Sequence, residues 1–196
     1  MILADSVPAP LDQPHDPPVD EPSDTGYHGS MPRRRRHPSL IPLWQQHRDA
    51  LMLAFRLRHP APPAPVTPMT PASTPQSRAA ETLAFYDHHL HGHFRAEEDQ
   101  LFPFLRRRMS DDTTRTALFE ELVAEHRRLA ALRDAIAAAD GEPALGAALA
   151  SFAELLETHV RREERELFEN FPDAVPPEET ETLAAAIRSL ARPPEA

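Results

Sequence analysis

Apolar residues recur at steps of three and four along most of the chain after Leu40, which is the period of one face of an α-helix. Four long stretches and one short one follow this pattern, separated by turn residues. The predicted helices cover about residues 40–59, 78–108, 113–139, 143–171 and 178–190. No stretch shows the strict alternation of a β-strand. The pattern predicts an all-α protein, an up-down-up-down four-helix bundle with a short fifth helix.

Two proline-rich segments lie outside the helical pattern. Residues 1–38 have almost no apolar periodicity, so they cannot bury enough surface to offset their ordering entropy and are predicted to be a disordered tail. Residues 60–77 are predicted to be a long, non-helical connection between the first two helices. The bundle domain is therefore expected to span residues 39–192.

Capping and helix-breaking residues agree with these boundaries. Ser39 is expected to cap the first helix, and Pro42 can be tolerated in its first turn. Gly141 is expected to end the third helix and Pro143 to open the fourth. Pro103 lies inside the second helix, where its missing N–H is expected to kink the last turns.

Composition excludes several kinds of site. The chain has no Cys, which rules out disulfides, zinc fingers, thiolate-held clusters and cysteine nucleophiles, so any metal site must use His, Asp and Glu. The 11 His and 31 acidic residues supply many such ligands. A net charge of −10 argues against nucleic-acid binding. No apolar stretch could span a bilayer and the N-terminus lacks the features of a secretory signal, so a cytoplasmic protein without a membrane partner is expected.

Each of the four long predicted helices carries one histidine in its apolar stripe: His47, His93, His126 and His159. Glu97 and Glu163 follow the second and fourth of these by four residues, which places each His and Glu on the same helix face. The last three histidines are 33 residues apart, and the midpoint of each interval falls in a predicted turn. Each of these histidines is therefore about 15 helical residues from its turn. At a rise of about 1.5 Å per residue this is roughly 22 Å, so the three histidines lie at the same height in the bundle.

Four histidines and two glutamates are therefore expected to converge on one layer of the bundle core. Burying two carboxylates side by side costs several kcal/mol each unless cations compensate. Two metal ions bridged by the carboxylates meet this need, and imidazole with carboxylate favours iron, ahead of manganese and zinc. The ferritin-like di-iron class is disfavoured because it needs Glu three residues before His, and neither His126 nor His159 has one.

The chain resembles the hemerythrin-like, or HHE cation-binding, domain family over about residues 40–190. The matching stretches are His93–Glu98 followed by Leu101-Phe102-Pro103, then Glu125–Leu129, and then His159–Glu164 followed by Leu167-Phe168. The resemblance implies two iron ions, with an oxo or hydroxo group and two carboxylates, Glu97 and Glu163, as bridges. The implied ligands are His47, His93, Glu97, His126, His159 and Glu163.

The resemblance also implies binding of, or reaction with, oxygen, nitric oxide or peroxide, as a sensor, scavenger or iron-handling protein rather than an enzyme with an organic substrate. A redox or iron-handling protein partner is compatible with these roles. Oxygen-carrying members place two histidines four apart on the third helix, whereas His126 has Leu122 and Ala130 at that spacing. One ligand is therefore missing, which favours a sensor or stress-response role over a carrier. His89 is a candidate replacement, set against a core or pocket-lining role.

Two other functions are compatible with the sequence. The first is a helical interaction module in which the metal is purely structural, so that its removal unfolds the protein. The second is a metal-free bundle with degenerate ligands. Around the site, Tyr86 is expected to pack in the core, Trp44 to form an apolar wall, and Glu98 and Glu164 to lie outside the ligand set or to exchange with their neighbours.

Overall fold

The computed structural model describes residues 37–60, 74–108, 113–171 and 175–191, and all regular structure in these ranges is helical. The all-α prediction is confirmed. The α-helices are α1 (Ile41–Arg58), α2 (Pro75–Phe85), α3 (His91–Ala96), α4 (Phe102–Arg108), α5 (Thr113–Ala138), α6 (Glu142–Arg162) and α7 (Pro177–Ala191). A short 3₁₀ helix, η1 (Pro38–Leu40), precedes α1, and three π-helical segments occur: η2 (Tyr86–Leu90), η3 (Glu97–Leu101) and η4 (Glu163–Phe168). Residues 1–36 of the predicted tail and 61–73 of the predicted loop lie outside the described residues, whereas Pro38, at the end of the predicted tail, begins η1.

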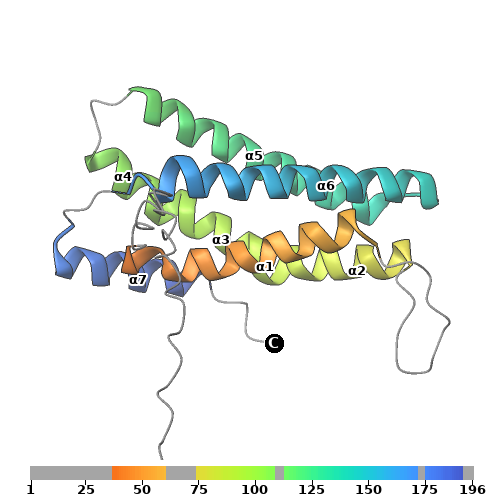
Figure 1. The fold of residues 1–196 in the computed structure, drawn as a ribbon, viewed down its shortest axis with the longest axis horizontal. Helices are drawn as coiled ribbons and strands as arrows, with labels where there is room; N and C mark the ends of the chain where they lie inside the picture. Colours follow the sequence, from red (N-terminus) through yellow and green to blue (C-terminus); the bar gives the residue numbers. More distant parts are fainter. Residues whose placement is uncertain (1–36, 61–73, 109–112, 172–174, 192–196) are drawn as a thin grey trace, which may run out of the picture. The chain divides into compact units, whose positions relative to one another are not determined.

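Four antiparallel helical rods form the bundle (Figure 1). The segments from α2 to α4 make one continuous rod, and η4 extends α6. Successive rods run in opposite directions, with α6 packed on both α1 and α5. The short helix α7 lies against α3 and α1. The predicted bundle with a fifth helix is confirmed, and each long rod presents one face to the others.

Helix ends agree with the sequence in most places but not in all. Gly141 has a φ of +91°, a conformation that side-chain-bearing residues rarely adopt, and it connects α5 to α6 as expected. The second rod begins at Pro75, three residues before the expected start, because the side chain of Thr74 accepts a hydrogen bond from the Ser77 N–H. The prediction for Ser39 is wrong: it lies inside η1, buried, and hydrogen-bonds the ring of His37 rather than capping α1.

The second rod stays helical through Pro103, and its irregularity lies just before that residue. Segment η3 ends two residues before Pro103, so the wider π-helical turn accompanies the position where proline cannot donate a hydrogen bond. The fourth rod has a π-helical segment in the equivalent place, η4, without a proline. Glu97 is the first residue of η3 and Glu163 is the first residue of η4.

The apolar core consists of two clusters with a polar layer between them. One cluster gathers around α4, η1, η4 and α7 and includes Phe102 and Phe119. The other gathers around α2, the second half of α5 and most of α6, and includes Phe152 and Leu156. Each long rod crosses from one cluster to the other, and the buried histidines and glutamates lie at the crossing. The bundle therefore encloses a layer of ionisable side chains at mid-height.

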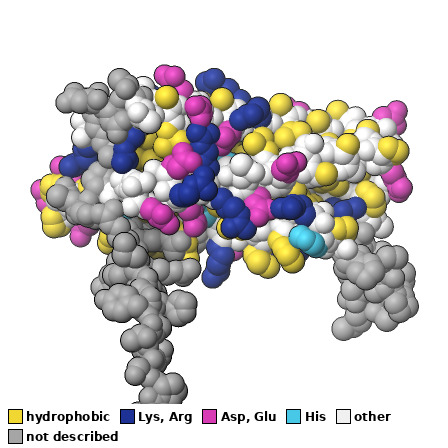
Figure 2. Space-filling model, turned by 45° about the horizontal axis from the view of Figure 1, so that its top comes forward, with side chains coloured by type: hydrophobic (Ala, Val, Ile, Leu, Met, Phe, Trp, Pro, Cys, Tyr) yellow, Lys and Arg dark blue, Asp and Glu magenta, His cyan; other side chains and the backbone are white. Residues whose placement is uncertain are grey.

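The surface carries interleaved charges. Arginine and acidic side chains alternate on the face shown in Figure 2 rather than forming separate fields. Glu157, for example, pairs with both Arg58 and Arg161. Such exposed pairs contribute little to stability. No helix in the described ranges is long and apolar enough to cross a membrane.

Candidate metal centre

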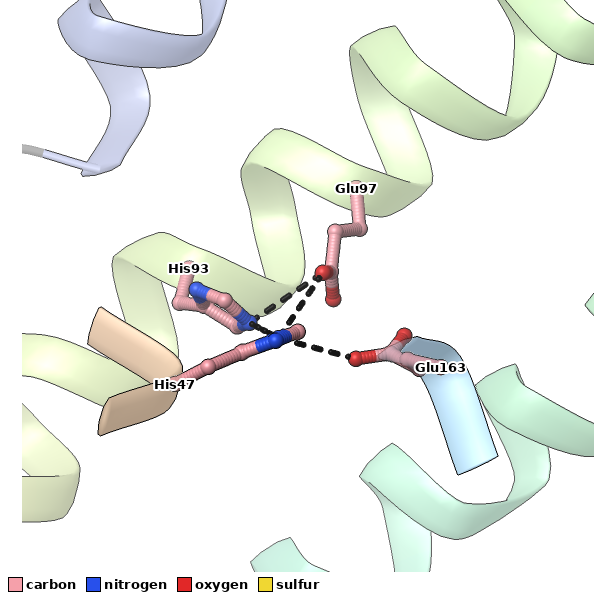
Figure 3. A group of neighbouring side chains, drawn as sticks. All are labelled: His47, His93, Glu97 and Glu163. Carbon is pink, nitrogen blue, oxygen red and sulfur yellow. Dashed lines mark hydrogen bonds and ion pairs between the residues drawn. The ribbon is translucent and has the colours of Figure 1, made fainter. Parts of the chain in front are cut away.

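His47, His93, Glu97 and Glu163 come from three different rods and point at one another (Figure 3). The Nε2 atom of His47 lies 3.1 Å from Nε2 of His93 and 3.1 Å from Oε2 of Glu163. The Nε2 atom of His93 lies 3.1 Å from Oε1 of Glu97. All four residues are at most 1% exposed.

His126 on α5 and His159 on α6 complete the set from the other side of the same two carboxylates. Their Nε2 atoms are 3.2 Å apart. The Nε2 atom of His126 lies 3.4 Å from Oε2 of Glu97, and Nε2 of His159 lies 3.4 Å from Oε2 of Glu163. The structure therefore brings all six sequence-predicted residues together, which agrees with the level heights expected from the 33-residue spacing.

The six side chains form two groups of four possible ligands that share Glu97 and Glu163. Position 1 is the group with His47 and His93, and position 2 is the group with His126 and His159. Within each group the ligand atoms lie within 4.8 Å of one another. Ligands about 2.0–2.2 Å from one ion are at most about 4.4 Å apart, so each group needs only a small contraction to hold a metal ion.

The two shared carboxylates have no hydrogen-bond partner among the described residues. All four oxygens of Glu97 and Glu163 are buried, and none makes a hydrogen bond of acceptable geometry within the described part of the chain. A buried carboxylate without such partners costs several kcal/mol, unless a cation compensates it. The side chains present therefore fit a pair of cations bridged by these carboxylates.

The pKa values of the histidines reflect this excess of negative charge. Burial lowers the pKa of His47, but the facing carboxylates, with Glu163 foremost, outweigh it and hold that pKa well above its usual value. Burial also opposes protonation of His126, yet its carboxylate neighbours, with Glu97 foremost, raise its pKa to about 9. At His93 burial prevails and lowers the pKa. One imidazole in each position thus attracts a proton toward the carboxylates, and a bound cation can replace that charge.

The outward-facing Nδ1 atom of each histidine meets a side chain from the preceding rod, and the four contacts close a ring. Gln46, Glu98, Glu125 and Glu164 make these contacts, with His93, His126, His159 and His47 respectively. Each of these four residues is the immediate sequence neighbour of one of the six inward-facing side chains. We call this set the outer ring.

Three members of the outer ring orient the imidazoles by hydrogen bonds. The Nδ1–H groups of His93, His126 and His159 donate to Gln46, Glu98 and Glu125 over 2.9, 2.7 and 2.8 Å. A carboxylate can only accept, so the Nδ1 atoms carry the hydrogen and the Nε2 lone pairs face the centre, as metal binding requires. The fourth member, Glu164, lies 3.6 Å from Nδ1 of His47. This nitrogen makes no hydrogen bond of acceptable geometry among the described residues.

Further contacts hold the outer ring in place. Arg162 donates to Glu125 over 3.1 Å and also pairs with Glu121 and Glu166. The amide of Gln46 donates to the backbone carbonyl of Ala191, the last residue of α7, over 2.7 Å. The fifth helix is therefore linked to a histidine of the centre through a single side chain.

Aromatic rings cover the centre on both sides. Phe168 stacks on His47 with ring centroids 4.9 Å apart, and Phe94 stacks on His126 at 4.0 Å. Tyr86 packs edge-on against Phe94 and Phe152, which confirms its expected core role. These rings exclude water and lower the local polarity around a bound ion.

Other neighbours behave partly as expected. Trp44 is partly buried and packs against the cluster around α4. The ring of His89 lies tilted against that of Phe85, with centroids 5.0 Å apart, and His89 belongs to neither group of possible ligands, so the structure does not place it as a replacement. Leu122, one turn before His126, is fully buried in the apolar core and supplies no ligand atom.

The sequence pattern did not single out the outer-ring roles of Gln46 and Glu125, or the stacking of Phe94 and Phe168. Gln46 was marked only by its adjacency to His47, whereas Phe94, Glu125 and Phe168 lie within the matching stretches but had no role assigned to them. Adjacent residues on a helix point about 100° apart, so adjacency alone does not show which neighbouring helix a side chain meets.

A comparison with protein families matches the hemerythrin HHE cation-binding domain over residues 42–171. Comparisons with curated proteins and with solved structures found no match. The family match spans all six converging residues, and two groups of His and Glu side chains that could hold metal ions lie between the two core clusters. The chain belongs to the hemerythrin HHE cation-binding family.

Proposed function

We propose that the protein holds two iron ions at positions 1 and 2 and binds or reacts with dioxygen, nitric oxide or a peroxide. The observation that supports this most directly is the pair of four-ligand groups sharing Glu97 and Glu163. Mixed imidazole and carboxylate ligands suit iron, and two carboxylates between the positions are typical of paired ions in helical bundles. Manganese and zinc are the alternative metals.

The number of ligands supports a reactive rather than a saturated centre. Each position offers two histidines and two shared carboxylates. Iron in such surroundings commonly takes more than four ligands, so positions for small exogenous ligands remain. Leu122 and Ala130 lie at the spacing where oxygen carriers have a further histidine, and neither supplies a ligand atom, so no side chain at that spacing fills that coordination position.

The protein's own residues would hold and shield the ions. Three outer-ring residues fix the orientation of His93, His126 and His159, and the rings of Phe94 and Phe168 limit the access of water. Iron supplies the redox chemistry and the affinity for diatomic ligands. No organic substrate is required for this function, so a sensor, scavenger or iron-handling role is favoured over an enzyme.

A second candidate function is a helical module with a structural metal centre. The complete burial of Glu97 and Glu163 and the location of the centre between the two core clusters favour it. Under this alternative the ions would hold the rods together, and no small molecule would reach them.

The test is anaerobic loading of the metal-free full chain with ferrous iron, followed by metal analysis and absorption spectra before and after admission of oxygen or nitric oxide. Two irons per chain and a new absorption on gas addition would support the proposal. Two irons with unchanged spectra and complete unfolding on chelation would favour the structural centre. Less than one iron per chain would refute both.

A matched pair of variants separates the centre from general surface effects. Glu97→Gln removes a shared charged ligand and is expected to lower the iron content to one ion or fewer. Glu81→Gln changes the same residue type on the same rod at an exposed site paired with Arg56, and is expected to retain two irons.

A further inference from the structure

Positions 1 and 2 have the same ligand types but different outer rings. At position 2, both histidines donate to carboxylates: His126 to Glu98 over 2.7 Å and His159 to Glu125 over 2.8 Å. At position 1, neither histidine does. His93 donates to the neutral amide of Gln46, and Nδ1 of His47 makes no hydrogen bond among the described residues.

This difference affects how strongly each imidazole donates to a metal. A carboxylate that accepts from Nδ1–H draws the proton toward itself and makes Nε2 a more basic ligand. A neutral amide does so less, and so does a carboxylate beyond hydrogen-bond distance, as Glu164 is from Nδ1 of His47 at 3.6 Å. Loss of one such partner commonly lowers metal affinity 10- to 100-fold. Position 2 has two short bonds of this kind, whereas the one carboxylate contact at position 1, from Glu164 to Nδ1 of His47, is longer, at 3.6 Å.

The neutral partner at position 1 has a structural reason. Gln46 must accept from His93 and donate to the carbonyl of Ala191 at the same time. An amide can do both, whereas a carboxylate has no hydrogen to donate. The contact that attaches α7 to the centre therefore requires an uncharged side chain behind His93.

We propose that the two positions are inequivalent: position 2 binds the first divalent cation tightly, and position 1 binds the second more weakly and exchanges it with solution. This inference rests on the proposed function, because it assumes that both positions bind metal. It gives the protein a one-ion form at low metal concentration and a two-ion form at high concentration. Such a difference suits an iron-handling or sensing role.

The two HxxxEE stretches offer a matched pair of variants. Glu98 and Glu164 each follow a shared carboxylate and occupy the second place of a π-helical segment. Glu98 accepts a hydrogen bond from His126, whereas Glu164 lies 3.6 Å from His47. Both side chains are partly exposed, at 37% and 28%, so substitution by Gln should be tolerated.

The test is anaerobic titration of the metal-free full chain with Co²⁺, followed by its visible absorption bands and by calorimetry. Wild type should bind two ions in two steps at least about tenfold apart. Glu98→Gln and Glu125→Gln should each weaken the first step about 10- to 100-fold. Glu164→Gln should change either step by less than about threefold, because its contact with His47 is longer, at 3.6 Å, than that of Glu98 with His126.

The outcomes are distinguishable from failure of the proposed function. Two ions bound with equal affinity in wild type would overturn the inequivalence and leave the two-ion centre standing. Weakening of the first step by Glu164→Gln as large as that by Glu98→Gln would also overturn it. Binding of no Co²⁺ by a chain with intact helical circular dichroism would overturn both.

Discussion

Gly92 on α3 lies where the fifth helix approaches most closely, so Gly92→Ala should loosen α7. A methyl carbon added there would lie 2.5 Å from the carbonyl oxygen of Leu190. Carbon and oxygen contact without repulsion at about 3.3 Å or more, so α7 must retreat by about 0.8 Å. The methyl carbon is fixed to the backbone of α3 and the oxygen is part of the backbone of α7, so neither atom can move without its helix. Overpacking of this kind costs about 1–3 kcal/mol.

The retreat also lengthens the hydrogen bond from Gln46 to Ala191, the residue after Leu190. Each kcal/mol lowers the melting temperature of a domain of this size by about 2–4 °C, so a fall of about 2–12 °C is expected. Chemical denaturation and thermal melting in the presence of a chelator measure this without any contribution from metal binding.

Gly146→Ala is the matched control. Gly146 lies on α6 with nothing within 4 Å of an added methyl group. Alanine there should stabilise the helix by about 0.5–1 kcal/mol through its better helix propensity. The two substitutions should therefore have opposite signs. Equal stability of the two variants, or a Gly92→Ala protein as stable as wild type, would show that α7 is not held against α3 in this way.

Three further predictions concern the centre. Chelation should lower the melting temperature of the metal-loaded protein. Free metal restored to about 1,000 times its dissociation constant should raise the free energy of unfolding by about 4 kcal/mol per independent ion, which denaturation at fixed metal concentrations measures. Phe94→Ala should destabilise the fold by about 3–5 kcal/mol and weaken metal binding, because Phe94 stacks on His126; calorimetric titration and melting should both change, and an effect on stability alone would contradict the stacking argument. Leu122→His should place an imidazole one turn before His126, lower the stability of the metal-free chain by about 1–3 kcal/mol and change the Co²⁺ spectrum, whereas an unchanged spectrum would show that the new side chain does not reach the ion.

The fold was predictable because helix geometry is regular. A constant rise per residue makes equal spacing mean equal height, so the positions of His93, His126 and His159 could be related without coordinates. The apolar stripes predicted the helical rods and their number. Ends were less certain, because Ser39 and Thr74 are both good capping residues and only the folded chain shows which of them accepts a backbone hydrogen bond.

The outer ring was predictable only in part: Glu98 and Glu164 were expected to lie outside the ligand set, but the histidine that each ring residue contacts was not predicted. The ring residues lie beside the inward-facing side chains, at the flank of each helix, where helical periodicity assigns them to neither core nor surface. Which rod a flank residue meets depends on the handedness of the bundle, and the pattern of apolar residues is the same for both hands. Gln46 illustrates this, because its two contacts lie on α3 and α7, 47 and 145 residues away.

The two HxxxEE stretches show how a repeated sequence can give an unequal site. In both, Leu follows His by eight residues, and a π-helical segment begins at the shared glutamate. The repeated local sequence therefore gives the same local structure twice, and the inward-facing ligands are matched. The outer-ring contacts are not matched. Glu98 faces a histidine on α5 at hydrogen-bond distance, whereas Glu164 faces one on α1 at 3.6 Å. The inequivalence of the two positions thus arises from the packing of the rods, so a substitution that shifts a rod should change relative affinities without touching any ligand.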